Sequence, residues 1–143
     1  MSVRQISVFL ENKKGRLAEA TTTLSREKIN IRALSLADTA DFGVLRIIVD
    51  SPDRAVAALK AHGFVAQVTE VIAVEVEDRP GGLAHILEVL DEDNVNVEYL
   101  YAYVEKTRDN AIVICRIDDR DRALQILQKH GIATLNAEAL KAL

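Results

Sequence analysis

The sequence predicts an α+β protein built from two βαββαβ units, residues 1–69 and 70–143. A polar loop that ends a run of alternating apolar residues and begins a helical pattern occurs twice, at Glu11–Ala18 and, 66 residues later, at Glu77–Ala84. Each loop is followed by the same succession of helix-like and strand-like patterns. A repeat of this kind favours two small domains over a single larger one.

The spacing of apolar residues places the individual elements. The first unit is expected to hold a strand over 3–10, a helix over 16–28, a hairpin of strands over 31–37 and 44–49, a helix over 52–61 and a strand over 64–68. The second unit repeats this order without a flexible linker at Thr69–Glu70. The offset between the copies grows from 66 to 68 residues, which places a two-residue insertion near Glu105–Asn110. A short helix is expected in the tail, 136–143.

The composition is that of a soluble globular protein, with 49% hydrophobic and 28% charged residues in a chain of 143. A formal net charge of −4 and scattered basic residues argue against a nucleic-acid partner. Because no apolar run approaches the roughly 20 residues of a membrane helix, neither a membrane span nor a secretion signal is expected. Cys115 is the single cysteine and allows no internal disulfide, so a reducing, cytoplasmic location is expected.

Two short patterns recur at matching places in the copies. An amide or acidic residue stands three places before a glycine, at Asn12–Gly15 and Asp78–Gly81, and an asparagine between apolar residues begins the second strand, at Asn30 and Asn96. Together with the two βαββαβ units, these patterns resemble the ACT domain family of small-molecule sensors over nearly the whole chain. The resemblance implies a stand-alone tandem ACT protein of ferredoxin-like units, with antiparallel sheets and the helices on one face.

The chemistry of these residues suits a small zwitterion. A helix start offers free N–H groups and partial positive charge to a carboxylate, and a glycine lets a ligand approach the backbone closely. An ammonium group needs acceptors, and those available are Asn12, Asp78, Asn30 and Asn96. A free α-amino acid is therefore the expected ligand, and a regulatory or sensor role is the expected function.

The resemblance also implies where the ligand binds. ACT units pair side by side and commonly bind amino acids where two units meet, which would bring Asn12–Gly15 toward Asn96 and Asp78–Gly81 toward Asn30. The predicted ligand-binding residues are Asn12, Gly15, Arg16, Leu17, Asn30, Asp78, Gly81, Gly82, Leu83 and Asn96.

Some positions depart from the family pattern. Lys14 stands where the pattern prefers proline, and Arg16 where it often has a small or apolar residue. The histidine that some amino-acid-binding members carry near the end of the first strand is replaced by Leu10 and Val76. Simpler roles also stay open: the glycines as turn residues, the asparagines as turn caps and Asp78 as a helix cap.

Other function classes find less support in the sequence. An acylphosphatase-like enzyme would want an arginine in a glycine-rich cradle, and Arg16 follows Gly15 without such a cradle. No nucleophile–base set or carboxylate pair is readable, His85 has no second ligand at metal spacing, and no cofactor is expected. His62 and His130 precede helix-ending glycines and are expected to be structural. RNA binding also finds little support, because it would need aromatic residues on the two central strands. A regulatory subunit that binds a metabolic enzyme without any ligand remains an alternative.

The second hairpin predicts an apolar face that the helices leave open. Leu100 aligns with Leu34 and is assigned to the helix-covered face, so the alternating tyrosines point to the other face. A monomer rarely leaves such a surface in water, and a homodimer is therefore expected. Its predicted interface residues are Tyr99, Tyr101, Tyr103, Ile112 and Ile114. The C-terminal tail is expected to hide only a portion of this face.

Overall fold

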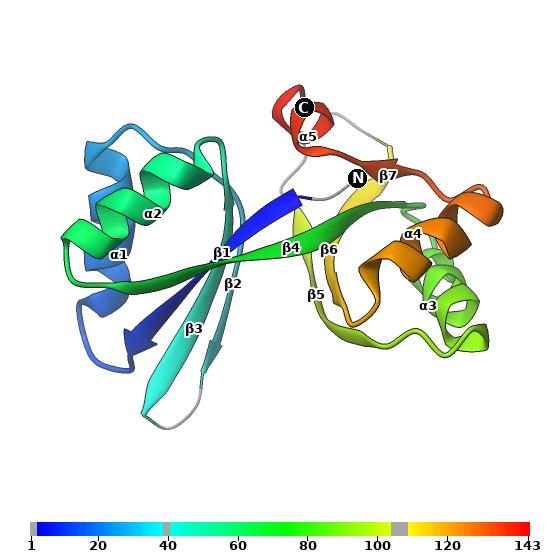
Figure 1. Cartoon of the computed structure of the whole chain (residues 1–143), viewed down its shortest axis with the longest axis horizontal. Helices are drawn as coiled ribbons and strands as arrows, with labels where there is room; N and C mark the ends of the chain where they lie inside the picture. The colour runs from blue at the N-terminus through cyan, green and yellow to red at the C-terminus, as the bar shows by residue number, and fades with distance from the viewer. Residues whose placement is uncertain (1–2, 39–40, 104–108) are drawn as a thin grey trace. The chain divides into compact units, whose positions relative to one another are not determined.

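A computed structural model of the chain describes residues 3–38, 41–103 and 109–143 (Figure 1). The chain divides into two compact units, Arg4–Thr69 and Glu70–Leu143, with the N-terminal end up to Val3 grouped with the second. The elements are β1 (Val3–Glu11), α1 (Arg16–Arg26), β2 (Ile31–Asp38), β3 (Phe42–Val49), α2 (Pro52–Ala61), β4 (Val65–Val76), α3 (Gly82–Glu92), β5 (Val97–Tyr103), β6 (Ala111–Ile117), α4 (Arg120–Lys129), β7 (Thr134–Leu135) and α5 (Ala137–Lys141). The predicted element order is therefore present in both units, and most of the predicted insertion near Glu105–Asn110 lies outside the described residues.

The first unit is an antiparallel sheet with its two helices on one face. Its strands follow the order β4-β1-β3-β2, and β3 pairs antiparallel with both β1 and β2. One core gathers side chains of β1, β3 and β4 with those of both helices, among them Ile6, Leu24, Ile47 and Leu59. Figure 1 shows α1 and α2 lying together beside this sheet. The alternation of apolar residues along β1 and β3 supplies the buried face, as the sequence predicts.

The second unit repeats this plan with β4 as its first strand. Antiparallel pairs join β5 to β6, β6 to β4 and β4 to β7, which gives the order β5-β6-β4-β7. The single strand β4 runs for 12 residues through the boundary at Thr69–Glu70. It ends one unit and begins the next, so the absence of a linker is confirmed. The second core lies under α3 and α4 and includes Val74, Leu90, Cys115 and Leu127.

The four long helices end in one arrangement. In α1, the Ile29 N–H donates to the Leu24 carbonyl at 3.0 Å and the Lys28 N–H to the Ser25 carbonyl at 2.9 Å, a Schellman motif. Lys28 takes a left-handed φ of 57°, so α1 ends at Arg26, two residues before the predicted end. The same pair of bonds closes the other three helices, and the apolar residues in the place of Ile29 are Phe64, Val95 and Ile132.

Burial along β2 and β5 differs from the sequence prediction. The register pairs Leu34 with Ile47 and Leu100 with Cys115, so both leucines do lie on the core face. They are nevertheless 49% and 37% exposed. In the first unit the core is built over β1, β3 and β4, and from β2 only the partly buried Ile31 packs against it. The strand β2 therefore extends beyond the helix layer, and the expectation that the helices cover these leucines is wrong.

The tyrosine face is buried in the single chain, contrary to the sequence prediction. Tyr101 and Tyr103 are 8% and 5% exposed, while Ile112 and Ile114 are 0% exposed, and only Tyr99 is partly exposed. The C-terminal tail covers part of this face, because the Tyr103 hydroxyl donates to the Leu140 carbonyl of α5 at 3.2 Å. These side chains form no apolar surface that needs a second copy. The homodimer therefore stays a prediction without the argument that motivated it.

The buried thiol of Cys115 gives a direct test of the second core. Burial raises the pKa of this thiol to about 12. Because the thiolate is the reacting species, we expect alkylation by iodoacetamide at about pH 8 to be far slower in the folded protein than in denaturant. Mass spectrometry of intact protein after timed labelling measures the two rates.

The same pKa shift makes the stability of the fold depend on pH. Folding raises the pKa of the thiol, so its contribution to stability is fully present below the unfolded pKa of about 8.5 and is lost as the pH rises from there through the folded pKa of about 12. Equal labelling rates for the folded and unfolded chain would contradict the buried position of Cys115.

Candidate functional site

The loops that precede α1 and α3 have the same backbone. The N–H of Lys13 donates to the Glu11 carbonyl at 2.8 Å, and the N–H of Arg79 donates to the Glu77 carbonyl at 2.9 Å. In each loop, the two residues joined by this backbone bond also form an ion pair. The pairs are Lys13–Glu11 at 3.2 Å and Arg79–Glu77. The repeated sequence pattern therefore has a repeated structure, and each loop leads directly into a helix.

Each of these helices begins at a glycine in a left-handed conformation. Gly15 has φ 91° and Gly81 has φ 85°, a region that L side chains adopt only with strain. No side chain caps either helix start, so the interpretation of Asp78 as a helix cap is wrong. Uncapped N–H groups and the positive end of the helix dipole remain available at both starts. This is the local chemistry that a carboxylate needs.

The two predicted asparagines lie at matching places and share one backbone arrangement. The Asn30 N–H donates to the Asp50 carboxylate at 3.3 Å, and the Asn96 N–H donates to the Asp118 carboxylate at 3.1 Å. In return, the N–H of each aspartate donates to the carbonyl of the asparagine. These bonds hold the first residue before β2 and β5, and both asparagines are exposed. The predicted pairing of each loop with the asparagine of the other copy stays a prediction.

Arg16 makes its contacts away from the loop before α1. Its guanidinium carbon lies 4.5 Å from the centroid of the Phe64 ring, and it bonds the Glu19 carboxylate at 2.7 Å. Only 20% of this side chain is exposed. An acylphosphatase-like reaction would need the guanidinium in the loop, so these contacts weigh against that alternative. Leu17 is 41% exposed, whereas its counterpart Leu83 is partly buried against the second core.

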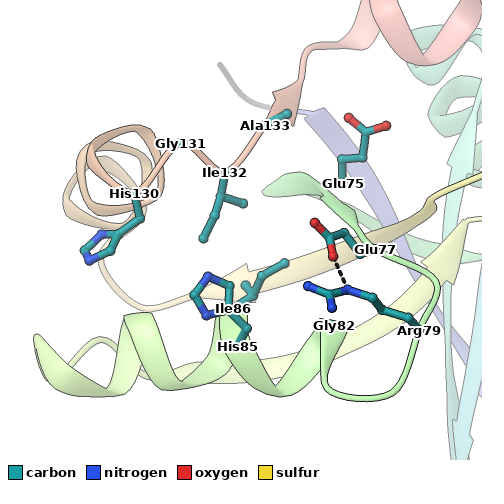
Figure 2. A pocket seen from close by; sticks show the side chains of 10 residues that line it. All are labelled: Glu75, Glu77, Arg79, Gly82, His85, Ile86, His130, Gly131, Ile132 and Ala133. Carbon is teal, nitrogen blue, oxygen red and sulfur yellow. Dashed lines mark hydrogen bonds and ion pairs between the residues drawn. The ribbon is translucent and has the colours of Figure 1, made fainter.

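A cavity of about 320 Å³ lies beside the loop of the second unit (Figure 2). It is lined by the end of β4, the first turns of α3 and the connection between α4 and β7. Figure 2 shows the imidazole of His85 on one side and the Glu77–Arg79 ion pair on the other. The apolar side chains of Ile86 and Ile132 lie between these polar walls. The cavity therefore borders a carboxylate paired with a guanidinium, as well as apolar side chains.

Two further lining residues owe their positions to backbone constraints. The His130 Nδ1 donates to the Ile126 carbonyl at 3.0 Å. This bond to the last turn of α4 confirms the predicted structural role of His130. Gly82 is buried, and a Cβ there would lie 2.0 Å from the Glu77 carbonyl oxygen. Only glycine therefore fits where the loop enters α3.

The sequence reasoning identified Gly82 but missed the other residues around the cavity. Arg79, His85, His130 and Ile132 come from three segments that only the fold brings together. One signal was present, since small residues in the second copy stand where the first copy has large ones. Gly82 corresponds to Arg16 at the offset of 66.

The described residues hold neither a metal-binding cluster nor a membrane-spanning helix. They contain no group of three or more histidine, cysteine, aspartate or glutamate residues placed to share a metal ion. In the same part of the chain, no helix is long and apolar enough to cross a membrane.

The two βαββαβ units and their paired helix-start loops match one protein family over the whole chain. The family described as an ACT domain pair matches residues 1–143. The chain belongs to this family, and the resemblance seen in the sequence is confirmed. Comparison with the curated proteins finds no match.

Solved structures with the same fold include a close and two distant relatives. A protein from Bacteroides thetaiotaomicron is 40% identical, with a TM-score of 0.92 over 100% of this chain and 98% of that one. The ligand-free regulatory subunit of aspartate kinase from Thermus thermophilus is 18% identical, with a TM-score of 0.63 over 88% and 91% of the two chains. The regulatory subunit of aspartate kinase from Thermus flavus is 14% identical, with a TM-score of 0.60 over 88% and 90%. The two aspartate kinase subunits show the fold alone.

The close approach at Gly82 predicts a difference between the copies. We expect Gly82→Ala to lower the free energy of unfolding by about 2–4 kcal/mol, because the new methyl group overlaps a backbone carbonyl. Arg16→Ala at the corresponding place removes one stacking contact and one ion pair, and should cost about 1 kcal/mol. Urea unfolding followed by circular dichroism measures both values. Equal losses in the two variants would mean that the loop before α3 relaxes freely.

Proposed function

We propose that this chain is a regulatory module that binds a free α-amino acid at its helix-start loops. The observation that carries the proposal is the pair of uncapped helix starts at Gly15 and Gly81. An uncapped start presents N–H groups and partial positive charge to a carboxylate, and the glycine keeps side chains out of the way. Membership of the ACT domain pair family supports a ligand-binding role, and an aspartate kinase regulatory subunit uses the same fold.

The loop of the second unit fits this role better than the loop of the first. It borders the cavity of Figure 2, and Glu77 with Arg79 supplies an acceptor for an ammonium group and a donor for a carboxylate. Asp78 is exposed beside them and makes no capping bond. In the first unit, the Arg16 guanidinium is engaged by Phe64 and Glu19. The two loops are therefore proposed to respond unequally.

A thermal-shift screen of the twenty amino acids tests the proposal. A ligand present at about one hundred times its dissociation constant stabilises a one-site protein by about 2.7 kcal/mol. For a chain of this size, the melting temperature should rise by roughly 5–10 °C. Calorimetry then confirms each hit. Absence of any shift at millimolar concentration, for all twenty compounds, would refute the amino-acid proposal.

Substitutions at the two glycines separate ligand binding from folding. Gly81→Val and Gly15→Val place the same side chain at similar φ, and a Cβ at either position meets no atom within 4 Å. The backbone strain should therefore be alike, about 1–3 kcal/mol in each variant. We expect Gly81→Val to remove most of the ligand-induced shift and Gly15→Val to retain most of it. If both variants respond like the wild type, the helix starts are turns without a binding role.

A further inference from the structure

The first unit leaves apolar side chains in water along one side of α1 and on the helix face of β2. Leu34 and Leu36 are each 49% exposed, and Leu17 is 41% exposed. Leu17 and Thr21 lie one turn apart on the same side of α1, and Thr21 lines an open groove of about 370 Å³ that extends to Ile31 at the start of β2. Single exposed leucines are ordinary, whereas three on neighbouring elements form an apolar surface. We call Leu17, Leu34 and Leu36 the α1–β2 surface.

The second unit presents the equivalent surface on α3 and β5. At the offset of 66, Leu100 corresponds to Leu34 and Ala102 to Leu36, and both second-unit residues are exposed. On α3, Leu87 takes the place of the first unit's threonine and is partly exposed. The two surfaces share one backbone, because β2 pairs with β3 in the same register as β5 with β6. We call Leu87, Leu100 and Ala102 the α3–β5 surface.

The segment that connects the helix to the strand borders each surface. It comprises residues 25–32 in the first unit and residues 91–98 in the second. Both segments adopt one conformation: Lys28 and Asn94 share a left-handed φ of 57°, and the residue after each donates its N–H to a leucine carbonyl of the helix at 3.0 Å. Ser25 and Lys28 line the groove, so the first segment lies directly beside its surface. Equivalent side chains of the two segments therefore start from equivalent backbone positions.

The two connecting segments carry opposite charge. Residues 25–32 contain three basic side chains and one acidic side chain, whereas residues 91–98 contain four acidic side chains and no basic one. Asp50 and Asp118 add one carboxylate to each segment at matching places, which leaves the difference unchanged. The units as a whole differ in the same direction, with a formal charge of +3 for the first and −7 for the second. The two short segments account for more than half of that difference.

We propose that a second copy of this chain binds here, with the α1–β2 surface of one copy against the α3–β5 surface of the other. Two-fold symmetry then supplies the reverse contact, so each copy uses both of its surfaces. The leucines lie in the middle of each contact, and the connecting segments bring basic side chains beside acidic ones. This assembly requires no ligand at the helix-start loops, so it stands apart from the proposed function.

Charge selects this pairing over the two alternatives. Two first units would bring basic segments together, two second units would bring acidic segments together, and both arrangements are repelled. Glu98 is already paired with Arg116 at 3.1 Å. The acidic side of the contact therefore rests on Asp91 and Glu92, which are exposed at the end of α3. On the basic side, Lys28 is exposed beside the groove.

Sedimentation velocity of the ligand-free chain tests the proposal. At tens of micromolar, the wild type should sediment as a dimer and should form no larger species, because the two contacts close on each other. Raising the sodium chloride concentration from about 0.1 M to about 0.5 M should weaken the dimer about fivefold, since salt shortens the range of the charges. A monomer, an open-ended series of oligomers or a dimer indifferent to salt would overturn the proposal.

Charge reversal on each side measures whether unlike units meet. Lys28→Glu and Asp91→Lys should each weaken the dimer about tenfold, because the change occurs twice in a two-fold dimer. The double variant Lys28→Glu/Asp91→Lys should regain most of the affinity, since each contact again joins opposite charges. Lys60→Glu is the matched control, because it makes the same charge change at an exposed residue in the last turn of α2. Equal effects of Lys28→Glu and Lys60→Glu, or no recovery in the double variant, would rule out the pairing of unlike units.

The leucines are tested by a substitution that the fold tolerates. Leu34→Ser changes a side chain that is 49% exposed, so the circular dichroism spectrum should stay unchanged. The variant should be a monomer at concentrations where the wild type is a dimer, because the middle of each contact is lost. Val65→Ser is the control and should remain dimeric, since Val65 is 61% exposed and belongs to neither surface. A dimeric Leu34→Ser chain, or loss of the dimer in both variants, would show that the second copy binds elsewhere.

Discussion

The arrangement on which both units depend is the hydrogen-bonded end of each long helix. Two backbone bonds close the helix and turn the chain sharply into the next strand. In every case an apolar residue follows the turn, and a leucine inside the helix carries the accepting carbonyl, as in Leu127 with Ile132. This pairing anchors each strand start to a core. It also decides which residue faces the first turns of the neighbouring helix, Phe64 in one unit and Ile132 in the other.

The two units show how one backbone can support different local chemistry. Their loops share the same turn, the same type of ion pair and the same left-handed glycine before the helix. The next residue differs, Arg16 in one copy and Gly82 in the other. In the first copy, the long side chain packs back across the helix start onto Phe64. In the second, the Glu77 carbonyl comes so close that no side chain is possible.

Most of the fold was predictable from the sequence, because the repeat supplied every pattern twice. The strand shared by the units, the positions of the helices and the faces of β2 and β5 all follow from apolar spacing. The exposed fraction of a side chain could not be predicted in this way. Leu34 is exposed on the core face and Tyr101 is buried on the other face, so the face of the sheet alone does not determine burial. The end of α1 was placed too late because Lys28 adopts a conformation that glycine usually takes. For the site, the loops were found by local chemistry, while His85 and His130 meet only through the fold.

The contact between Arg16 and Phe64 bears on how steeply the chain can report the level of a ligand. Two open sites in one chain could be coupled, so that filling one changes the affinity of the other. A chain in which only one loop binds a ligand has only one occupancy to transmit. Saturation then rises from one-tenth to nine-tenths over a ligand range of about 80-fold, which is a graded response. Any sharper threshold has to arise outside the single chain, from assembly with further subunits.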